Sequence, residues 1–516
     1  MKLTEKQLAQ IHDKGIDVAA LERQLSRFIN GFPGISLEGA AVINDGILQI
    51  SEQRKDQLIT YYKNQTAQLD ILKFVPASGA ATRMFKFLHQ FVNSYNPDEE
   101  SINAYINKNN ARELFTFFIA LEKFPFYNEI IVQLKEQYPD WLAKPDRVKK
   151  LLFAKHVLTA AGMNYGNMPK GLVPFHKYKD HSATAFEEHL FEASIYAASN
   201  NNAQLHFTIA PAFKGHFKSE FERIKQIVEK KTNTSIDISF SYQHEHTDTV
   251  AVDKNNQPVV TEDGLLFFRP SGHGALLANL NDLQADVLFI KNIDNVTVSS
   301  LEQEVAAYKN MLAGLLLELQ QQSFDYLKKI DDTSISNDLI IEIEQFLQQQ
   351  LCTVFPNNYV KFAPAHQLEY LHDRLNRPLR ICGMVKNEGE PGGGPFWVKN
   401  QKGEISLEIV ESAQVDKKDK KQQQIFKSGT HFNPVDIVCG LKDYRGNKFD
   451  LLNYCDPDTG FITYKSRLGK DIKAQERPGL WNGGMAYWNT VFVEVPLLTF
   501  NPVKTVNDLL KPAHQN

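Results

Sequence analysis

The first 70 or so residues follow a helical pattern of apolar and polar positions. Thr4 with Gln7 forms a capping-box pattern, and Asp17 precedes a segment whose Leu21 and Phe28 fall on one helical face. A further helix is expected over residues 51–65. We therefore interpret residues 1–70 as a helical N-terminal extension.

The pattern changes at residue 71. An apolar run at 71–75 precedes a loop of small residues at 76–81 and a helical pattern at 82–95, the order that opens an α/β fold. Helical patterns then fill residues 112–161. Beyond them strands and helices alternate, with strands expected at 205–209, 236–242 and 287–291 and helices at 213–230, 301–322 and 337–350.

From about residue 379 the pattern becomes β-rich, with strands expected at 380–385, 396–399 and 405–410. The lysine- and glutamine-rich run at 417–424 is interpreted as a solvated loop. We expect one large α/β domain over residues 71–516, with a helical insertion at 84–165 and a β-rich part from about 379.

Composition narrows the class of protein. The chain has 516 residues, of which 42% are hydrophobic and 23% charged, with a net charge of −4. This balance is typical of a soluble globular protein and gives no general attraction to nucleic acid or an anionic membrane. The four cysteines have no CxxC spacing, and the chain has no signal-peptide pattern and no membrane-length apolar run. We expect a cytoplasmic enzyme.

The small-residue loop after the first predicted strand is the strongest local sign of chemistry. Ala77, Ser78, Gly79 and Ala80 would let backbone N–H groups approach a phosphate, and Arg83 would stand in the first turn of the helix that follows. The glycine spacing and the lysine of the known phosphate-binding loops are absent. Taken alone, a tight turn with a surface arginine explains the segment better.

Two lysines stand in conspicuous contexts. Lys170 lies in a loop between Pro169 and Pro174, and Lys504 directly precedes a helix capped by Thr505. Each lysine would supply a compact positive charge for a phosphate. The alternative for each is an ordinary exposed lysine.

Gly272, His273 and Gly274 form an open loop before a predicted helix, and Asp294 follows the predicted strand at 287–291. Ligands of open α/β sheets gather at the carboxyl ends of strands, where a carboxylate is a natural ligand for Mg²⁺. His244 and His246 suggest zinc, but their spacing does not match a zinc motif and a coincidence is the favoured interpretation.

Taken in order, these segments resemble the UDP-sugar pyrophosphorylases of the nucleotidyltransferase superfamily, and we interpret the chain as a bacterial branch of it. The motifs are Gly-Ala-Ala-Thr-Arg at 79–83, Pro-Lys-Gly-Leu-Val-Pro at 169–174, Pro-Ser-Gly-His-Gly at 270–274, Asn-Ile-Asp-Asn at 292–295 and Pro-Val-Lys-Thr at 502–505. The resemblance implies a GT-A-like, Rossmann-like fold with a mixed sheet flanked by helices.

The resemblance also implies residue roles. It makes Arg83, Lys170 and Lys504 catalytic phosphate ligands and Asp294 the ligand of Mg²⁺. Nucleotide binding falls to Ala77, Ser78, Gly79, Ala80, Gln243, Gly272, His273 and Gly274, and sugar binding to Glu390 and Asn433.

The implied reaction joins an NTP and a sugar 1-phosphate into an NDP-sugar with release of pyrophosphate. The attacking phosphate oxygen is already ionised, so the chemical need is to neutralise charge and to position two polyanions. Three cations and Mg²⁺ meet that need without a nucleophilic serine or cysteine. The altered phosphate loop and the large helical insertion favour an alternative, a non-catalytic sugar-nucleotide-binding protein.

Overall fold

The computed structural model describes residues 3–332, 335–390, 392–467 and 470–516 and has a mixed α/β fold. The chain forms two compact units, each built from segments that are far apart in sequence. Unit 1 comprises Met1–Phe74, Ser241–Ile290 and Tyr308–Pro496, and unit 2 comprises Val75–Phe240, Lys291–Ala307 and Leu497–Asn516. Among the described residues, no helix combines the length and apolarity that a membrane crossing requires.

Unit 1 contains a mixed sheet in which parallel pairs predominate. Its strands run in the order β2 (Val42–Ile43), β3 (Gly46–Leu48), β19 (Asn489–Glu494), β13 (Leu379–Met384), β16 (Asp436–Gly440), β12 (Val287–Ile290) and β4 (Ile71–Pro76). Only β16 is antiparallel to its neighbours among these strands. The carboxyl ends of β4, β12, β13 and β19 therefore share one edge of this sheet.

Smaller sheets and helices complete unit 1. The smaller sheets are β1 (Ser36–Ala40) with β14 (Gly394–Lys399) and β15 (Ile405–Val410), β10 (Thr249–Val250) with β11 (Phe268–Arg269), and β17 (Phe461–Arg467) with β18 (Lys470–Glu476). The helices are α1 (Glu5–Asp13), α2 (Val18–Asn30), α3 (Glu52–Gln65), α11 (Leu276–Asn281), α13 (Asn337–Gln349), α14 (Pro364–Leu375) and α15 (Lys420–Lys427). Helix α12 (Ser299–Asp331) has residues in both units.

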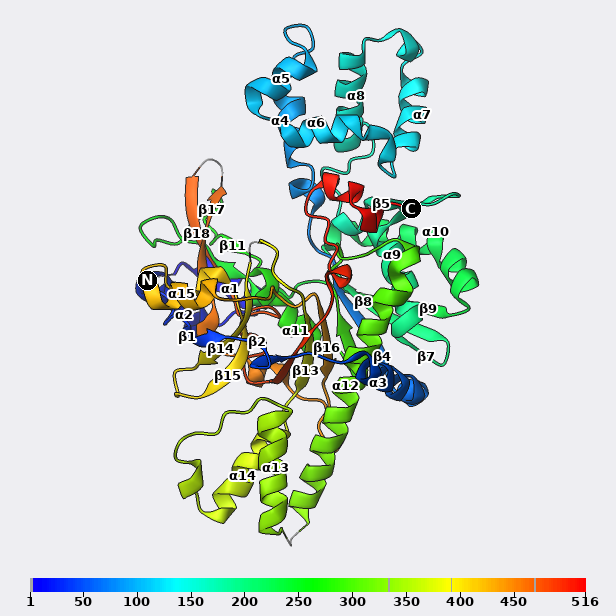
Figure 1. The fold of residues 1–516 in the computed structure, drawn as a ribbon. Helices are drawn as coiled ribbons and strands as arrows, with labels where there is room; N and C mark the ends of the chain where they lie inside the picture. The colour runs from blue at the N-terminus through cyan, green and yellow to red at the C-terminus, as the bar shows by residue number, and fades with distance from the viewer. Residues whose placement is uncertain (1–2, 333–334, 391, 468–469) are drawn as a thin grey trace. The chain divides into compact units, whose positions relative to one another are not determined.

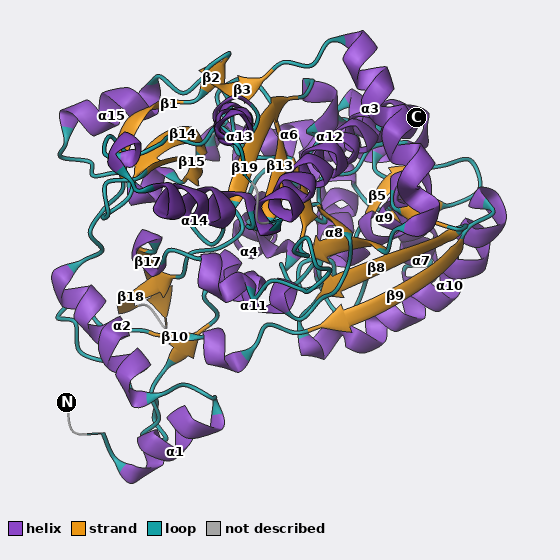
Figure 2. Ribbon diagram, turned by 90° about the horizontal axis from the view of Figure 1, so that it is seen from below, coloured by secondary structure: helices purple, strands orange, loops and turns teal. Residues whose placement is uncertain are grey.

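Unit 2 combines a small β layer with a helical module. Strand β8 (Asn202–Thr208) pairs with β7 (Ala198–Ser199) and β9 (Ser235–Ser241), and Figure 2 shows β8 and β9 side by side. Phe186 of α9 (Ala185–Tyr196) packs on Phe207 of β8, and Phe217 of α10 (Lys214–Thr232) packs near Phe240 of β9. Strands β5 (Pro174–Lys177) and β6 (Ser182–Thr184) form a separate hairpin.

The helical module of unit 2 comprises α4 (Lys86–Ser94), α5 (Ile102–Asn109), α6 (Arg112–Ile119), α7 (Tyr127–Gln137) and α8 (Asp146–Leu158), which lie together in Figure 1. Its core is rich in aromatic rings, such as Phe91, Phe117 and Phe153. Val503, Val506 and Leu509 from the end of the chain belong to the same core. Residues 497–516, which we call the C-terminal strap, are thus anchored in this module.

The predicted α/β fold, with a mixed sheet flanked by helices, is confirmed. The capping box at Thr4 and the cap at Asp17 are present, and strands form at 71–76 and 287–290. Other predictions are wrong. Residues 420–427 form helix α15, which overlaps the run at 417–424 that was expected to be a loop and which Asp419 caps at the backbone N–H groups of Lys421 and Gln422. The N-terminal segment is not helical throughout, because residues 36–40, 42–43 and 46–48 form strands β1, β2 and β3. The domain boundaries at 70, 84, 165 and 379 stay predictions.

Candidate functional site

The small-residue loop and the lysine loop of unit 2 are joined backbone to backbone. The Lys170 N–H donates to the Gly79 carbonyl at 3.1 Å, and the Ala81 N–H donates to the Met168 carbonyl at 2.9 Å. Thr82 Oγ1 adds a hydrogen bond to the Gly166 carbonyl at 3.1 Å. The two loops therefore form one surface that carries Gly79, Ala80 and Lys170.

Lys170 links this surface to two further segments of unit 2. Its Nζ atom lies 2.9 Å from Asp294 Oδ2 and donates to the Val503 carbonyl oxygen at 2.8 Å. The Lys170 and Asp294 side chains are 18% and 21% exposed, so the ion pair is open to solvent on one side. One ammonium group thus brings together the lysine loop, the residues after β12 and the C-terminal strap.

Buried polar groups fix the segment that carries Asp294. Lys291 Nζ pairs with Glu192 Oε1 at 2.6 Å, with both side chains buried. His189 Nε2 donates to the Ile293 carbonyl at 3.2 Å, and the Val503 N–H donates to the Asp294 carbonyl at 3.1 Å. The Asp294 backbone is therefore fixed while its carboxylate stays accessible.

Asn295 fixes the strap beside Asp294. Its Oδ1 atom accepts from the Asn501 N–H at 2.7 Å, and its Nδ2 atom donates to the Thr499 carbonyl at 3.1 Å. The Asn295 side chain is buried, and its backbone forms a β-bridge with Pro502. Asn295 belongs to the Asn-Ile-Asp-Asn motif, but nothing in the sequence indicates its role. Its partners lie about two hundred positions away, so no local pattern could reveal them.

Lys504 and Arg83 both lie at the surface of unit 2. Lys504 follows Val503 directly, and its N–H donates to Asp508 Oδ2 at 2.9 Å, next to the Thr505–Asp508 capping box of a short 3-10 helix. Arg83 ends another 3-10 turn at residues 81–83, and no ion pair involves it among the described residues. The expected helix at 82–95 begins only at Lys86. The α-helix dipole therefore gives no support at Arg83, whose role stays a prediction.

The predicted base- and ribose-binding residues belong to unit 1. Gln243 follows β9 by two residues in a segment held by Asn279 Nδ2, which donates to the Tyr242 carbonyl at 2.7 Å. The ring of His273 lies 5.0 Å from that of Trp481, edge to face. A Cβ atom at Gly274 would lie 2.7 Å from the Arg477 carbonyl oxygen, so the two backbones need a glycine there. The nucleotide-binding roles of these residues, and of Gly272 beside them, stay predictions.

The predicted sugar-binding residues, Glu390 and Asn433, also belong to unit 1. Asn433 Nδ2 donates to Glu411 Oε1 at 3.0 Å, and burial raises the pKa of Glu411. Asn433 Oδ1 is buried without a hydrogen-bond partner among the described residues. Glu390 is half-buried in the glycine-rich loop before β14. Both roles stay predictions.

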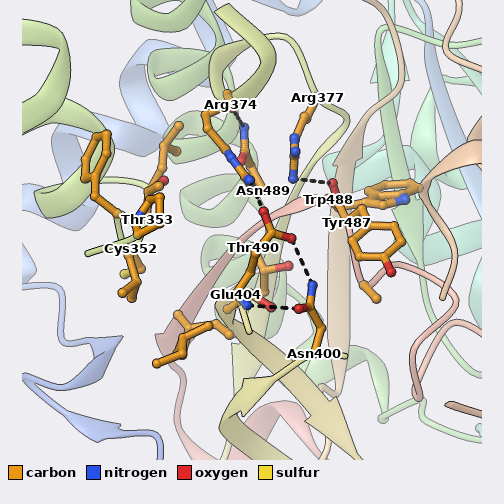
Figure 3. A pocket seen from close by; sticks show the side chains of 18 of the residues that line it. Cys352, Thr353, Arg374, Arg377, Asn400, Glu404, Tyr487, Trp488, Asn489 and Thr490 are labelled. Carbon is orange, nitrogen blue, oxygen red and sulfur yellow. Dashed lines mark hydrogen bonds and ion pairs between the residues drawn. The ribbon is translucent and has the colours of Figure 1, made fainter. Parts of the chain in front are cut away.

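A separate cavity of about 220 Å³ lies at the amino-terminal ends of β13 and β19 in unit 1 (Figure 3). Arg374 pairs there with Glu404, whose carboxylate also accepts from Asn400 Nδ2 at 2.9 Å. Burial alone would raise the pKa of Glu404, but Asn400 and Arg374 lower it below its usual value. Because Arg377 likewise pairs with Asp373, both guanidinium groups already face a carboxylate.

The donor set around Asp294 allows a test of the expected Mg²⁺. Among the described residues, no group of three or more His, Cys, Asp or Glu side chains could hold a metal ion. Mg²⁺ is commonly bound through one or two carboxylates together with substrate phosphates. The single, partly exposed Asp294 carboxylate therefore fits an ion that arrives with a polyphosphate. His244, which the sequence pattern suggests for zinc, pairs with a carboxylate: its Nε2 atom lies 2.8 Å from Asp282 Oδ2.

Comparisons with known proteins add three findings. No curated protein matches the chain. Among solved structures, the chain is similar to the uridine diphosphate N-acetylglucosamine pyrophosphorylase from Trypanosoma brucei, with 12% identity, a TM-score of 0.47 and coverage of 98% of this chain and 79% of that one. It is also similar to the UDP-glucose phosphorylase from Trypanosoma brucei, with 13% identity, a TM-score of 0.45 and coverage of 98% and 77%.

A family model matches residues 4–515, which is nearly the whole chain. The chain therefore belongs to the family described as Domain of unknown function (DUF4301).

Proposed function

We propose that the chain is a Mg²⁺-dependent nucleotidyltransferase that forms an NDP-sugar and pyrophosphate from an NTP and a sugar 1-phosphate. The observation that carries the proposal is the meeting of Lys170, Asp294 and the Val503 carbonyl, with Lys504 next in sequence. These residues come from three segments of unit 2, at 170, 294 and 503–504. A cation, a carboxylate and a second cation on fixed backbones form a site suited to a metal-bound polyphosphate.

In the proposed reaction, an oxygen of the sugar 1-phosphate attacks the α-phosphorus of the NTP. The bond between the α-phosphorus and its bridging oxygen breaks, and that oxygen leaves with pyrophosphate. Because the attacking phosphate oxygen is already ionised, no base has to remove a proton. Lys170 and Lys504 would bind phosphate oxygens, Arg83 would add bidentate contacts, and the N–H groups of Gly79 and Ala80 would approach the chain of phosphates. Mg²⁺ on Asp294, when bound, would neutralise further phosphate charge.

The Lys170–Asp294 ion pair has a consequence for nucleotide binding. While the pair is closed, the lysine and the aspartate neutralise each other, and neither is fully available to a ligand. A polyphosphate would compete with Asp294 for the ammonium group, and the freed carboxylate could then bind a cation. The proposal therefore implies that nucleotide and Mg²⁺ bind together rather than separately.

The test is pyrophosphate release by the wild-type protein, measured with each of the four NTPs and a panel of sugar 1-phosphates. Asp294→Asn and Lys504→Ala are expected to lower turnover by about 10²–10³-fold, in the range found for loss of one transition-state donor. Asp140→Asn removes a carboxylate from an exposed ion pair with Lys144 and serves as the matched control. Absence of turnover with every substrate pair would contradict the proposal.

The same ion pair favours a second candidate, a protein that binds sugar nucleotides without catalysis, because the proposed metal ligand already has a cationic partner. Thermal melting with an NDP-sugar separates the two. A rise in melting temperature that is equal with and without Mg²⁺, in a protein without turnover, would support binding alone. A rise that requires Mg²⁺ would support the enzyme.

A further inference from the structure

The C-terminal strap is held by a chain of buried side chains that the proposed chemistry does not use. His514 Nε2 donates to the Asn501 carbonyl at 3.1 Å, and His514 Nδ1 lies 2.9 Å from His176 Nε2. His176 Nδ1 lies 2.6 Å from Glu188 Oε1. All three side chains are almost completely buried, with exposed fractions of at most 1%. We call Glu188, His176 and His514 the relay.

In a neutral relay, every hydrogen bond is donated toward the Asn501 carbonyl. Because the Asn501 carbonyl can only accept, His514 carries its proton on Nε2, and in a neutral ring its Nδ1 atom is an acceptor. His176 must then donate from Nε2, which leaves its Nδ1 atom as an acceptor in a neutral ring. Glu188 completes the chain only if its carboxyl group is protonated and donates to His176.

Burial supports this neutral arrangement. Loss of solvent lowers the pKa of His176 and of His514 to about 3, and it raises the pKa of Glu188 well above its usual value. Glu188 Oε2 is buried and has no hydrogen-bond partner among the described residues. An unpaired oxygen is far less costly in a neutral carboxyl group than in a carboxylate.

Other titratable groups face the relay from each neighbouring element. Tyr178 donates to Glu188 Oε1 at 2.8 Å. Burial and the carboxylates of Glu187 and Glu192 on α9 raise the pKa of Glu188, whereas this hydrogen bond and the nearby His181 lower it. On the strap, Asp508 raises the pKa of His514 and Lys511 lowers it. The nearby acidic groups oppose ionisation of Glu188, in agreement with the neutral chain.

The relay acts on the same short segment that meets the candidate site. Asn501 accepts from His514 through its carbonyl and donates through its N–H to Asn295, the neighbour of Asp294. Two residues later, the Val503 carbonyl accepts from Lys170, and Lys504 follows. The side chains of His514 and Asn295 both bond to the Asn501 backbone, and loss of the His514 hydrogen bond would leave only that of Asn295.

We propose that His514, supported by His176 and Glu188, is a positioning residue that holds the strap so that the Val503 carbonyl and Lys504 stay beside Lys170 and Asp294. The catalytic part of this inference rests on the proposed function, whereas the holding of the strap does not.

The first test is hydrogen exchange, measured by mass spectrometry on peptides from residues 497–516. His514→Phe keeps a ring beside Phe175 but removes both hydrogen bonds, and it is expected to speed exchange in the strap about tenfold or more while β8 and β9 are unchanged. His514→Gln can still donate to Asn501 and should restore most of the protection. His366→Phe, at an exposed position of α14, is the control.

Glu188→Gln tests the direction of the relay. A glutamine amide can donate to His176 as a protonated carboxyl group does, so the melting temperature and the strap exchange should stay close to wild type. A large fall in melting temperature would show that Glu188 is ionised and would overturn the neutral relay. This variant also keeps the inference testable if His514→Phe does not fold.

Kinetics separate positioning from simple stability. If the wild-type protein turns over, His514→Phe should lower kcat at least tenfold with a smaller change in KM, and His514→Gln should recover most of kcat. Strap exchange equal to wild type in His514→Phe would overturn the inference whether or not turnover is found. Faster exchange with unchanged kcat would overturn the positioning role, and a wild type without turnover would contradict the proposed function alone.

Discussion

Asn295 shows how much one side chain determines at the candidate site. Its carboxamide accepts from Asn501 and donates to Thr499, so each end of the group has a different required partner. An aspartate has the same shape but cannot donate when ionised. The neighbouring Asn292 is exposed and provides a natural comparison within the same motif.

We expect Asn295→Asp to lower the free energy of unfolding by about 3 kcal/mol at pH 7, because a buried carboxylate oxygen would face the Thr499 carbonyl. The loss should shrink at pH 5 as the carboxyl group takes up a proton and regains a donor. Urea denaturation at both pH values measures it, with Asn292→Asp as the control. Equal stability of the two variants would mean that Asn295 does not clamp the strap.

At the scale of elements, the relay makes the stability of unit 2 depend on pH. Between pH 6.5 and about 4.5, the unfolded chain binds two protons on His176 and His514, whereas the folded relay keeps only the proton of Glu188. The unfolded state thus binds about one proton more, and stability falls as pH falls.

The expected slope on the acid side is about 1.4 kcal/mol per pH unit from this cluster. His514→Phe removes one of the two titrating histidines, so its slope from the cluster should be close to zero over the same range. Urea denaturation of both proteins at several pH values between 4.5 and 7.5 gives the difference directly. Parallel curves for the two proteins would show that the histidine is not kept neutral in the folded state.

The elements that sequence predicted correctly have local causes. The capping box at Thr4, the cap at Asp17 and the buried run at 71–75 are each determined by neighbouring residues. Helix α15 has a local signal in the cap at Asp419, but the contact that fixes it on the fold is remote: Gln422 accepts from the Leu37 N–H at 2.7 Å and donates to the Leu37 carbonyl at 3.1 Å. A run of lysine and glutamine carries no sign of such a partner.

The same distinction applies to the candidate site. Lys170, Asp294 and Lys504 stood in motifs that could be recognised along the chain, although only the fold brings the first two into contact. The relay could not be predicted, since His176 and His514 are separated by 338 positions and neither lies in a motif. The sequence thus indicated the charged residues of the candidate site, whereas only the fold shows which buried side chains fix the segments that carry them.

At the scale of the molecule, the first residues of the chain are part of unit 1. Ile11, Leu21 and Phe28 share a core with Val250 and Leu266. Gln24 Oε1 accepts from the Val250 N–H at 2.9 Å, and Gln10 exchanges two hydrogen bonds with Leu266. Strand β1 pairs with β14 in the same unit. The predicted N-terminal extension therefore contributes to the packing of a unit formed mainly by later residues.

Removal of residues 1–30 should accordingly expose the core around Val250 and lower the melting temperature of unit 1 or prevent soluble expression. Gln24→Ala in the full chain is a milder test, because it leaves the buried Val250 N–H without an acceptor and should cost about 1–3 kcal/mol. Arg23→Ala, at the exposed neighbouring position, should have little effect on urea denaturation. A truncated protein that melts cooperatively at the wild-type temperature would instead make residues 1–30 an independent appendage, with contacts that add nothing to the stability of unit 1.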